Sequence, residues 1–157
     1  MPNHCCNLLY LQPDALIEIT GKYVRKNEHN EDVFDFELIV PVGEVEDWYK
    51  QRCEKWGTKW TGYDLNIGET VIDFFTAWSP PVPIIKKLAE LHKNIEFRLE
   101  YYETGCAFRS VATAKWQDGE ALLDDQCWEM TQKDLEELGL VDPEDEEENE
   151  NALQEET

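Results

Sequence analysis

The sequence contains no apolar run long enough to span a membrane. Its first residues, MPNHCCNLLYLQ, lack the basic region and apolar core of a signal peptide. We therefore expect a cytosolic protein that makes no contact with a membrane. The five cysteines are odd in number and irregularly spaced, so the sequence does not predict a disulfide framework in that compartment.

Motifs for catalysis and for cofactor binding are also missing. No CxxC pair, phosphate-binding P-loop or GxGxxG motif occurs in the chain. His4, Cys5 and Cys6 are adjacent soft ligands, but two neighbouring cysteines cannot easily bind the same tetrahedral zinc ion. Buried side chains that begin a strand are the favoured interpretation. Nothing local ties Cys53 or Cys106 to a histidine base. We predict no enzyme activity, no metal site and no cofactor.

Basic residues are few, and the deficit is greatest in the C-terminal part of the chain. Residues 1–116 hold 13 Lys and Arg against 18 Asp and Glu, a net charge of −5. Residues 117–157 hold only Lys133 against 17 acids, a net charge of −16. This distribution argues against direct binding to nucleic acid or to an anionic membrane, because both need a positive surface. A basic protein surface is the partner that such a charge attracts.

The apolar residues that are present recur with the periods of strands and helices. Strands are predicted at residues 7–12, 33–40, 70–77, 95–101 and 106–116, and an edge strand or an extended loop is predicted at 61–66. Helices are predicted from Asp14 to about Val24, from Glu44 to a stop at Gly57, and from a cap at Ser79 to about His92. This order predicts an α+β protein with a ferredoxin-like (split βαβ) antiparallel sheet and helices on one face.

The C-terminal part predicts an acidic helical extension followed by a tail. Thr131 is placed to cap a helix that Gly139 ends. Residues 142–157 contain nine acids and no basic residue, so they cannot bury enough apolar surface to offset the entropy of ordering. We divide the chain into a domain at 1–117, an acidic helical extension at 118–141, and a tail at 142–157 that is expected to be disordered when free.

The segment from Trp56 to Pro83 holds three of the six tryptophans. Large aromatic side chains build either a core or an interface. The favoured interpretation is a satellite core of tryptophans at one end of the sheet, and the alternative is a surface for a ligand or partner. The candidate residues of that alternative surface are Trp56, Lys59, Trp60, Tyr63, Asp64 and Trp78.

A sheet with exposed aromatic residues could also bind RNA by stacking. Phe97, Tyr102 and Phe108 would be the stacking residues. Packing in the core beneath the helices is the favoured interpretation, because the basic contacts that backbone binding requires are scarce.

Several motifs occur in an order that resembles a known family. They are PNHCCNLL, FDFELIVPV, WGTKWTGYD, FFTAWSPPVPIIKKLAEL and FRLEYYETGCAF. Together they resemble the YubB-like (Api-type) family of ferredoxin-like domains, small proteins of phages and plasmids. The resemblance covers residues 2–116. It implies a ferredoxin-like fold and an origin on a mobile element, and therefore the host cell cytoplasm, but no activity.

The leading functional hypothesis joins that origin to the charge. We expect an interaction protein that binds a basic nucleic-acid-handling host protein or defence complex and acts partly as a nucleic-acid mimic, as an anti-CRISPR or anti-restriction inhibitor would. The alternative is a protein- or ligand-binding module that uses the Trp56–Pro83 surface and carries a passive solubilising tail. The candidate acidic residues of the leading hypothesis are Asp118, Glu120, Asp124, Asp125, Glu129, Asp134, Glu136, Glu137, Glu144, Asp145, Glu146, Glu147 and Glu148.

Overall fold

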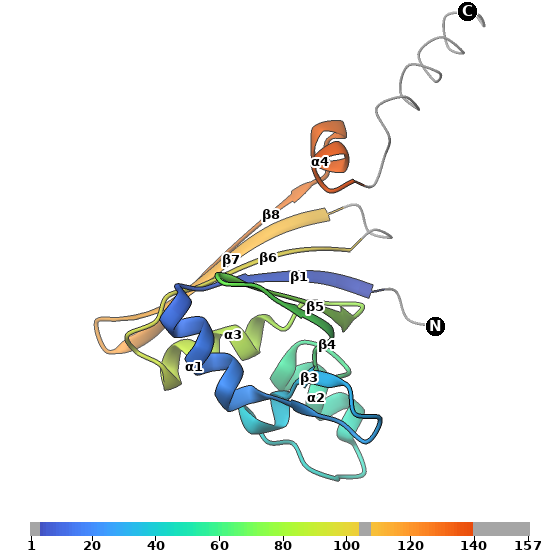
Figure 1. The fold of residues 1–157 in the computed structure, drawn as a ribbon, viewed down its shortest axis with the longest axis vertical. Coiled ribbons are helices and arrows are strands. Elements are labelled where there is room, and N and C mark those ends of the chain that lie inside the picture. The colour runs from blue at the N-terminus through green and yellow to red at the C-terminus, as the bar shows by residue number, and fades with distance from the viewer. Residues whose placement is uncertain (1–3, 104–107, 140–157) are drawn as a thin grey trace, which may run out of the picture.

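A computed structural model describes residues 4–103 and 108–139 of the chain. These residues form a six-stranded sheet, a two-stranded ribbon and four α-helices (Figure 1). The strands of the sheet are β1 (His4–Tyr10), β4 (Tyr63–Ile67), β5 (Val71–Ala77), β6 (Phe97–Glu103), β7 (Phe108–Gln117) and β8 (Glu120–Glu129). The helices are α1 (Pro13–Tyr23), α2 (Trp48–Trp56), α3 (Val82–Leu91) and α4 (Gln132–Glu137). No helix in this part of the chain has the length and apolar character that crossing a membrane requires.

The topology confirms the predicted ferredoxin-like fold. The strands follow the spatial order β4-β5-β1-β6-β7-β8, and each neighbouring pair is antiparallel. β1 therefore runs parallel to β4 with β5 between them, and β5 runs parallel to β6 with β1 between them. These are the two interleaved, split βαβ units, connected through α1 and α3. β7 and β8 extend the sheet beyond β6.

The core lies between one face of the sheet and the helices. Alternate residues of the central strands are buried on this face, with Leu9, Ile72 and Leu99 each at 0% exposure. α1, α2 and α3 all lie on that side of the sheet (Figure 1). Burial of each such side chain contributes about 1.5–3 kcal/mol. On the opposite face, side chains such as Leu8 and Phe75 are half-buried, and no described helix covers them.

A long insertion joins α1 to β4 and packs beside the β4 edge. It contains the ribbon strands β2 (Val24–Lys26) and β3 (Asp32–Phe34), the short 3-10 helix η1 (Phe36–Leu38) and α2. β3 meets the start of β4 through two backbone hydrogen bonds between Phe34 and Gly62, at 2.9 and 3.0 Å. The ring of Phe34 lies 5.3 Å from that of Phe74. The insertion therefore shares the main core.

The predicted strand at 33–40 is wrong beyond Phe34. The carboxylate of Asp35 accepts a hydrogen bond from the backbone N–H of Glu37 at 3.0 Å, which caps η1. The carboxylate of Glu37 in turn accepts one from the N–H of Gly43 at 2.8 Å. These side chains take the place of a strand partner for the backbone. The alternation of apolar and polar residues over 33–40 predicted a strand, but the 3-10 turn buries Phe36 equally well.

The predicted helical extension at 118–141 is also wrong over most of its length. β8 pairs with β7 residue for residue, from Gln117 opposite Glu120 to Phe108 opposite Glu129. The turn between them uses Asp118 and Gly119 at φ 53° and 82°, the two positive values that a tight hairpin turn requires. Only α4 is helical, and Thr131 caps it as predicted. The expected boundary at 117 therefore falls inside a hairpin, and the tail at 142–157 lies outside the described residues.

Candidate functional site

The segment between α2 and β4 is shaped by a glycine that no other residue can replace. Gly57 ends α2, as predicted, with φ at 79°. A Cβ atom there would lie 2.7 Å from Cδ of Pro83 and 2.9 Å from the carbonyl oxygen of Pro80. Both the backbone conformation and the contact demand glycine. The turn brings the end of α2 against the proline-rich start of α3.

The tryptophans around this turn do not share one environment. Trp56 is 1% exposed, packs edge-on against Phe36 at 5.8 Å, and donates a hydrogen bond to the carbonyl oxygen of Val40 at 2.8 Å. Trp60 and Trp78 are 37% and 49% exposed. Trp56 is buried, but in the main core and not in a satellite core, and the predicted burial is wrong for Trp60 and Trp78.

Two basic side chains lie against aromatic rings and organise the exposed tryptophans. Along α2, Trp48, Arg52 and Trp56 follow at intervals of four residues, and the guanidinium carbon of Arg52 lies 4.9 Å from the centre of each indole ring. The ammonium nitrogen of Lys59 lies 4.6 Å from the ring of Trp60, and 5.4 and 6.0 Å from two further rings. Such contacts contribute about 0.5–1 kcal/mol each at exposed sites. The aromatic–cation cluster, as we call it, comprises Trp48, Tyr49, Arg52, Trp56, Lys59, Trp60 and Trp78.

Trp78 occupies an unfavourable backbone conformation. Its φ is 66°, which is uncommon for a bulky side chain. The turn around it is closed by a hydrogen bond from the N–H of Ser79 to the carbonyl oxygen of Ala77 at 2.8 Å. The predicted role of Ser79 as a helix cap is wrong, since its hydroxyl donates instead to the carbonyl oxygen of Gly57 at 2.5 Å and α3 is capped by Pro81. Strain of this kind costs about 1–3 kcal/mol and concentrates at functional sites.

A cavity of about 860 Å³ adjoins this cluster, between the insertion, the start of β4 and the start of β1. Its walls are mostly apolar, and Arg52, Trp56 and Trp60 bring the aromatic–cation cluster to one side of it. His4 and Tyr63 line it as well. A cavity of this size with mostly apolar wall area is typical of a site for a small ligand, although three carboxylates and one guanidinium group are also among its lining residues.

His4 and Tyr63 hold each other in place on the cavity wall. Nδ1 of His4 lies 2.5 Å from the hydroxyl oxygen of Tyr63, and the two rings meet edge-on at 5.6 Å. Phe75 supports both, at 5.1 and 6.1 Å between ring centres. Burial raises the pKa of Tyr63 above its usual value, so its hydroxyl keeps its proton at neutral pH. The two rings are therefore an ordered surface for a ligand to contact, and the hydroxyl of Tyr63 is a neutral polar group on it.

The acidic side chains of the cavity are largely engaged elsewhere. Asp35 forms an ion pair with Arg25, and Glu37 accepts the backbone hydrogen bonds that shape the loop after η1. Glu31 has only a long contact, 3.5 Å, from the amide of Asn27. Across residues 4–103 and 108–139, no group of three or more potential ligands could hold a metal ion.

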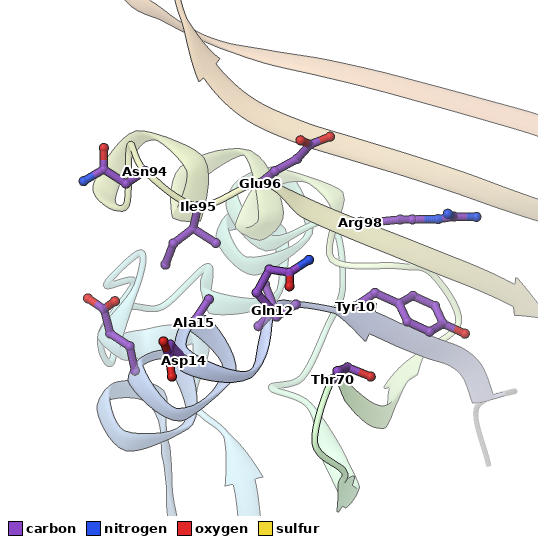
Figure 2. A pocket seen from close by; sticks show the side chains of 11 residues that line it. Tyr10, Gln12, Asp14, Ala15, Thr70, Asn94, Ile95, Glu96 and Arg98 are labelled. Carbon is purple, nitrogen blue, oxygen red and sulfur yellow. The ribbon is translucent and has the colours of Figure 1, made fainter.

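A second cavity of about 710 Å³ lies where β1 leads into α1 and β6 begins. Figure 2 shows that Asp14 and Ile95 flank it, while Tyr10 and Arg98 extend side by side away from α1. Two of its four charged side chains already have partners, since Arg98 pairs with Glu100 at 2.9 Å and Glu18 pairs with Lys22 at 3.2 Å. It contains none of the residues that the sequence predicted for a site, so we favour the first cavity.

The predicted acidic residues are spread along β8, the hairpin turn and α4. The exposed ones in the described part are Asp118, Glu120, Asp124, Asp125, Glu129, Glu136 and Glu137. Successive residues of a strand point to opposite faces, so Asp124 and Asp125 do not form one continuous anionic surface. Asp125 also accepts a hydrogen bond from the hydroxyl of Tyr101 at 3.0 Å. The remaining candidates, Glu144, Asp145, Glu146, Glu147 and Glu148, lie outside the described residues.

Asp134 differs from the other acids because it is 8% exposed. Its carboxylate accepts hydrogen bonds from the N–H of Thr131 at 2.9 Å, from Arg109 at 2.9 Å and from the indole of Trp128 at 3.2 Å. The backbone hydrogen bond from Thr131, aided by these other donors, lowers the pKa of Asp134 to about 2. Asp134 therefore fastens α4 to the β7–β8 hairpin instead of facing a partner.

Of the alternative surface, Trp56, Trp60 and Tyr63 line the favoured cavity, while Lys59 and Trp78 belong to the adjoining cluster. Asp64 is exposed at a bulge in β4, with φ at 52°. Sequence reasoning missed Arg52, Trp48 and His4 as site residues. The four-residue spacing of Trp48, Arg52 and Trp56 was a readable signal, whereas nothing local connects His4 to a residue 59 positions later.

No curated protein and no solved structure matches the chain. A family model described as the ferredoxin-like domain in Api92-like protein matches residues 55–157. The match includes β8 and α4, which the motifs had left outside the resemblance, whereas β1 and α1, which complete the sheet and its first βαβ unit, precede it. The chain therefore belongs to the family of ferredoxin-like domains found in Api92-like proteins.

Proposed function

We propose that this protein is a non-enzymatic binding module whose recognition site is the 860 Å³ cavity together with the aromatic–cation cluster at its rim. One observation carries the proposal. Trp48, Tyr49, Trp60 and Trp78 stay 37–49% exposed although they gather around two basic side chains. Clustered exposed aromatic residues mark interaction sites, because tryptophan, tyrosine and arginine dominate binding energies.

Two further features support a binding role. The strained backbone of Trp78 holds an exposed ring beside Lys59, a conformation that packing in the core does not require. None of the described cysteines lines the cavity, and the hydroxyl of its Tyr63 keeps its proton at neutral pH. The walls are suited to contact a ligand, and we assign the contact between His4 and Tyr63 to holding the two rings in place.

The test is a fragment screen read through the indole N–H signals of ¹⁵N-labelled protein. The six tryptophans report on separate parts of the molecule. We expect hits to shift the signals of Trp56 and Trp60, and to leave those of Trp116 and Trp128 on β7 and β8 unchanged. Trp60→Ala should weaken these hits by about tenfold or more. Hits that shift only Trp116 or Trp128, or no hits at all, would overturn the proposal.

A second candidate function is favoured by the acidic edge of the sheet. β8 is an edge strand that presents Glu120, Asp124, Asp125 and Glu129 to solvent. We propose as this alternative that a basic nucleic-acid-handling protein of the host binds there and along the acidic end of the chain. Under this alternative, the protein is encoded by a phage or a plasmid and inhibits a CRISPR or restriction system of the host. Its physical basis is long-range electrostatic steering.

The two functions are separated by capture from host lysate at low and at high salt. The baits are the full chain, residues 1–141, the Trp60→Ala variant, and a variant with Asp124→Asn and Asp125→Asn. The acidic function predicts capture that falls with salt, with truncation and with neutralisation, but persists in Trp60→Ala. If only Trp60→Ala abolishes capture, the acidic function is wrong and the aromatic surface is the site.

A further inference from the structure

The aromatic–cation cluster lies in a positive stretch of a strongly negative protein. Residues 48–62 contain four basic side chains and a single acid, Glu54, for a net charge of +3 in a chain whose net charge is −21. The basic residues are Lys50, Arg52, Lys55 and Lys59. None of them forms an ion pair with a carboxylate of residues 4–103 or 108–139, and among the four arginines of these residues only Arg52 lacks one, since Arg25, Arg98 and Arg109 are all paired. Several described lysines elsewhere are also unpaired, so the informative member of this stretch is Arg52.

Arg52 is the member of this stretch that lines the cavity. Its guanidinium group is held between the rings of Trp48 and Trp56, which fixes its orientation. Its Nε is buried and has no hydrogen-bond partner among the described residues, and its Nη1 has only a long bond, 3.4 Å, to the carbonyl oxygen of Lys59. An arginine normally offers five donors to acceptors in a fixed planar arrangement. Arg52 is therefore oriented in advance for an acceptor that residues 4–103 and 108–139 do not supply.

The rest of the cavity is suited to a flat ring. Trp60, Tyr63 and His4 contribute ring surfaces to the walls, and aromatic rings favour stacked or edge-on contact with other rings. The nearby carboxylates of Asp35 and Glu37 are held by Arg25 and by backbone N–H groups, which offsets their repulsion of an anion. The cavity thus combines ring surfaces with one unpaired guanidinium group, and Glu31 is the lining carboxylate that has no close partner among the described residues.

We infer that the cavity binds a planar aromatic ring that carries one anionic group, either a carboxylate or a phosphate. The ring lies against Trp60 and Tyr63, and the anion is bound by Arg52. This inference rests on the proposed binding function and adds to it the chemical class of the ligand. Charged hydrogen bonds to arginine are about twice as strong as neutral ones, so the anion contributes selectivity in addition to the affinity of the ring.

The experiment compares matched probes by calorimetric titration of the full chain. Indole-3-propionate, tryptamine and 3-methylindole share one ring and carry a negative, a positive and no charge. AMP and adenosine make the same comparison for a phosphate. We expect the anionic member of each set to bind about tenfold more tightly than the neutral one, and tryptamine to bind most weakly. A larger advantage for AMP than for indole-3-propionate identifies phosphate as the source of the anion, and the reverse identifies a carboxylate.

Substitution assigns the selectivity to Arg52. Arg52→Gln should abolish the preference for the anion while leaving the binding of 3-methylindole within about twofold, and Arg52→Lys should retain part of the preference. Lys55→Gln is the matched control, since it removes one charge from the same helix but does not line the cavity. If Arg52→Gln does not fold, the wild-type preference must still decline as salt is added.

Equal binding of charged and neutral probes would overturn the assignment of an anion, while the binding function stands. Tighter binding of tryptamine would also overturn it and would point to Glu31 and its acidic neighbours. The absence of binding by every probe would overturn the ligand class. The indole N–H screen then decides separately whether the cavity binds any other fragment.

Discussion

The two edges of the sheet are protected in opposite ways. At the β4 edge, the insertion packs alongside through Phe34 and Gly62 and brings in the aromatic–cation cluster. At the β8 edge no further described strand pairs, and nearly every residue is exposed (Figure 1). Edge strands invite pairing with other chains, and charged side chains are one natural way to prevent it. The acids of β8 thus have a structural explanation that does not need a partner.

Because the acids of β8 have this structural explanation, negative charge alone is weak support for a basic binding partner. A charged edge keeps sheets from aggregating whether or not it also binds a protein. The β4 edge is different because its exposed tryptophans, its strained Trp78 and its unpaired Arg52 have no such general explanation. Geometry therefore favours the β4 edge as the site, although the acidic end is the larger anomaly of composition.

The largest difference between the edges should appear when a tryptophan is removed from each. Trp56→Ala deletes a buried ring and its hydrogen bond to Val40, and should lower the free energy of unfolding by about 3–5 kcal/mol. Trp128→Ala removes a ring that is 38% exposed and should cost about 1–2 kcal/mol. Urea unfolding measures both. Equal losses would show that the two edges are packed alike.

Two glycines with similar φ values allow the cost of the left-handed backbone conformation to be measured separately from the cost of a side-chain clash. Gly57 and Gly119 have φ values of 79° and 82°, but only Gly57 has neighbours within 4 Å of a Cβ position. Gly119→Ala should cost about 1–2 kcal/mol, from the left-handed conformation alone. Gly57→Ala should cost about 1–3 kcal/mol more, because its methyl group also clashes with Pro80 and Pro83. Thermal and urea unfolding test this order, and the reverse order would contradict the close packing at the β4 edge.

Acid should loosen the β8 edge locally. The folded pKa of Asp134 is about 2, below its ordinary value of 3.8, so its stabilisation is complete above pH 3.8 and is lost as the pH falls toward 2. Over that range we expect the indole signal of Trp128 to move toward that of an exposed ring. Asp134→Asn should show the moved signal at neutral pH and no such transition. Glu136→Gln, on an exposed neighbour in α4, is the control that should leave the transition in place.

The smallest effect concerns the lysines that lie over rings at the two edges. Lys59 contacts the rings of three residues, and Lys93 contacts one, that of Trp116 at 4.4 Å. Lys59→Gln and Lys93→Gln should each lower the free energy of unfolding by about 0.5–1 kcal/mol, with Lys59 at the upper end. Replicate chemical denaturation resolves such differences. A larger loss for Lys93 would show that the rings around Lys59 do not act together.

Local patterns predicted most of the fold and little of the site. Ile72 and Phe74 on β5, and Ile84 and Leu88 on α3, follow the periods of their elements, so their burial could be read directly. The hairpin turn at Asp118-Gly119 was also legible, since Asp-Gly between two runs of strand residues favours it. It was missed because the acidic composition after residue 117 was taken as the sign of a separate extension.

The sequence by itself determined the strands and helices of the two βαβ units, the end of α2 at Gly57, the cap at Thr131 and the uneven charge. Each depends on neighbours within a few positions. Only the tertiary structure decided that Trp56 is buried while Trp60, four residues later, is exposed, and that Asp134 faces inward among exposed acids. Burial depends on contacts between segments far apart in the chain. The same long-range packing places His4 beside Tyr63 and turns the tryptophan-rich segment into one wall of a cavity.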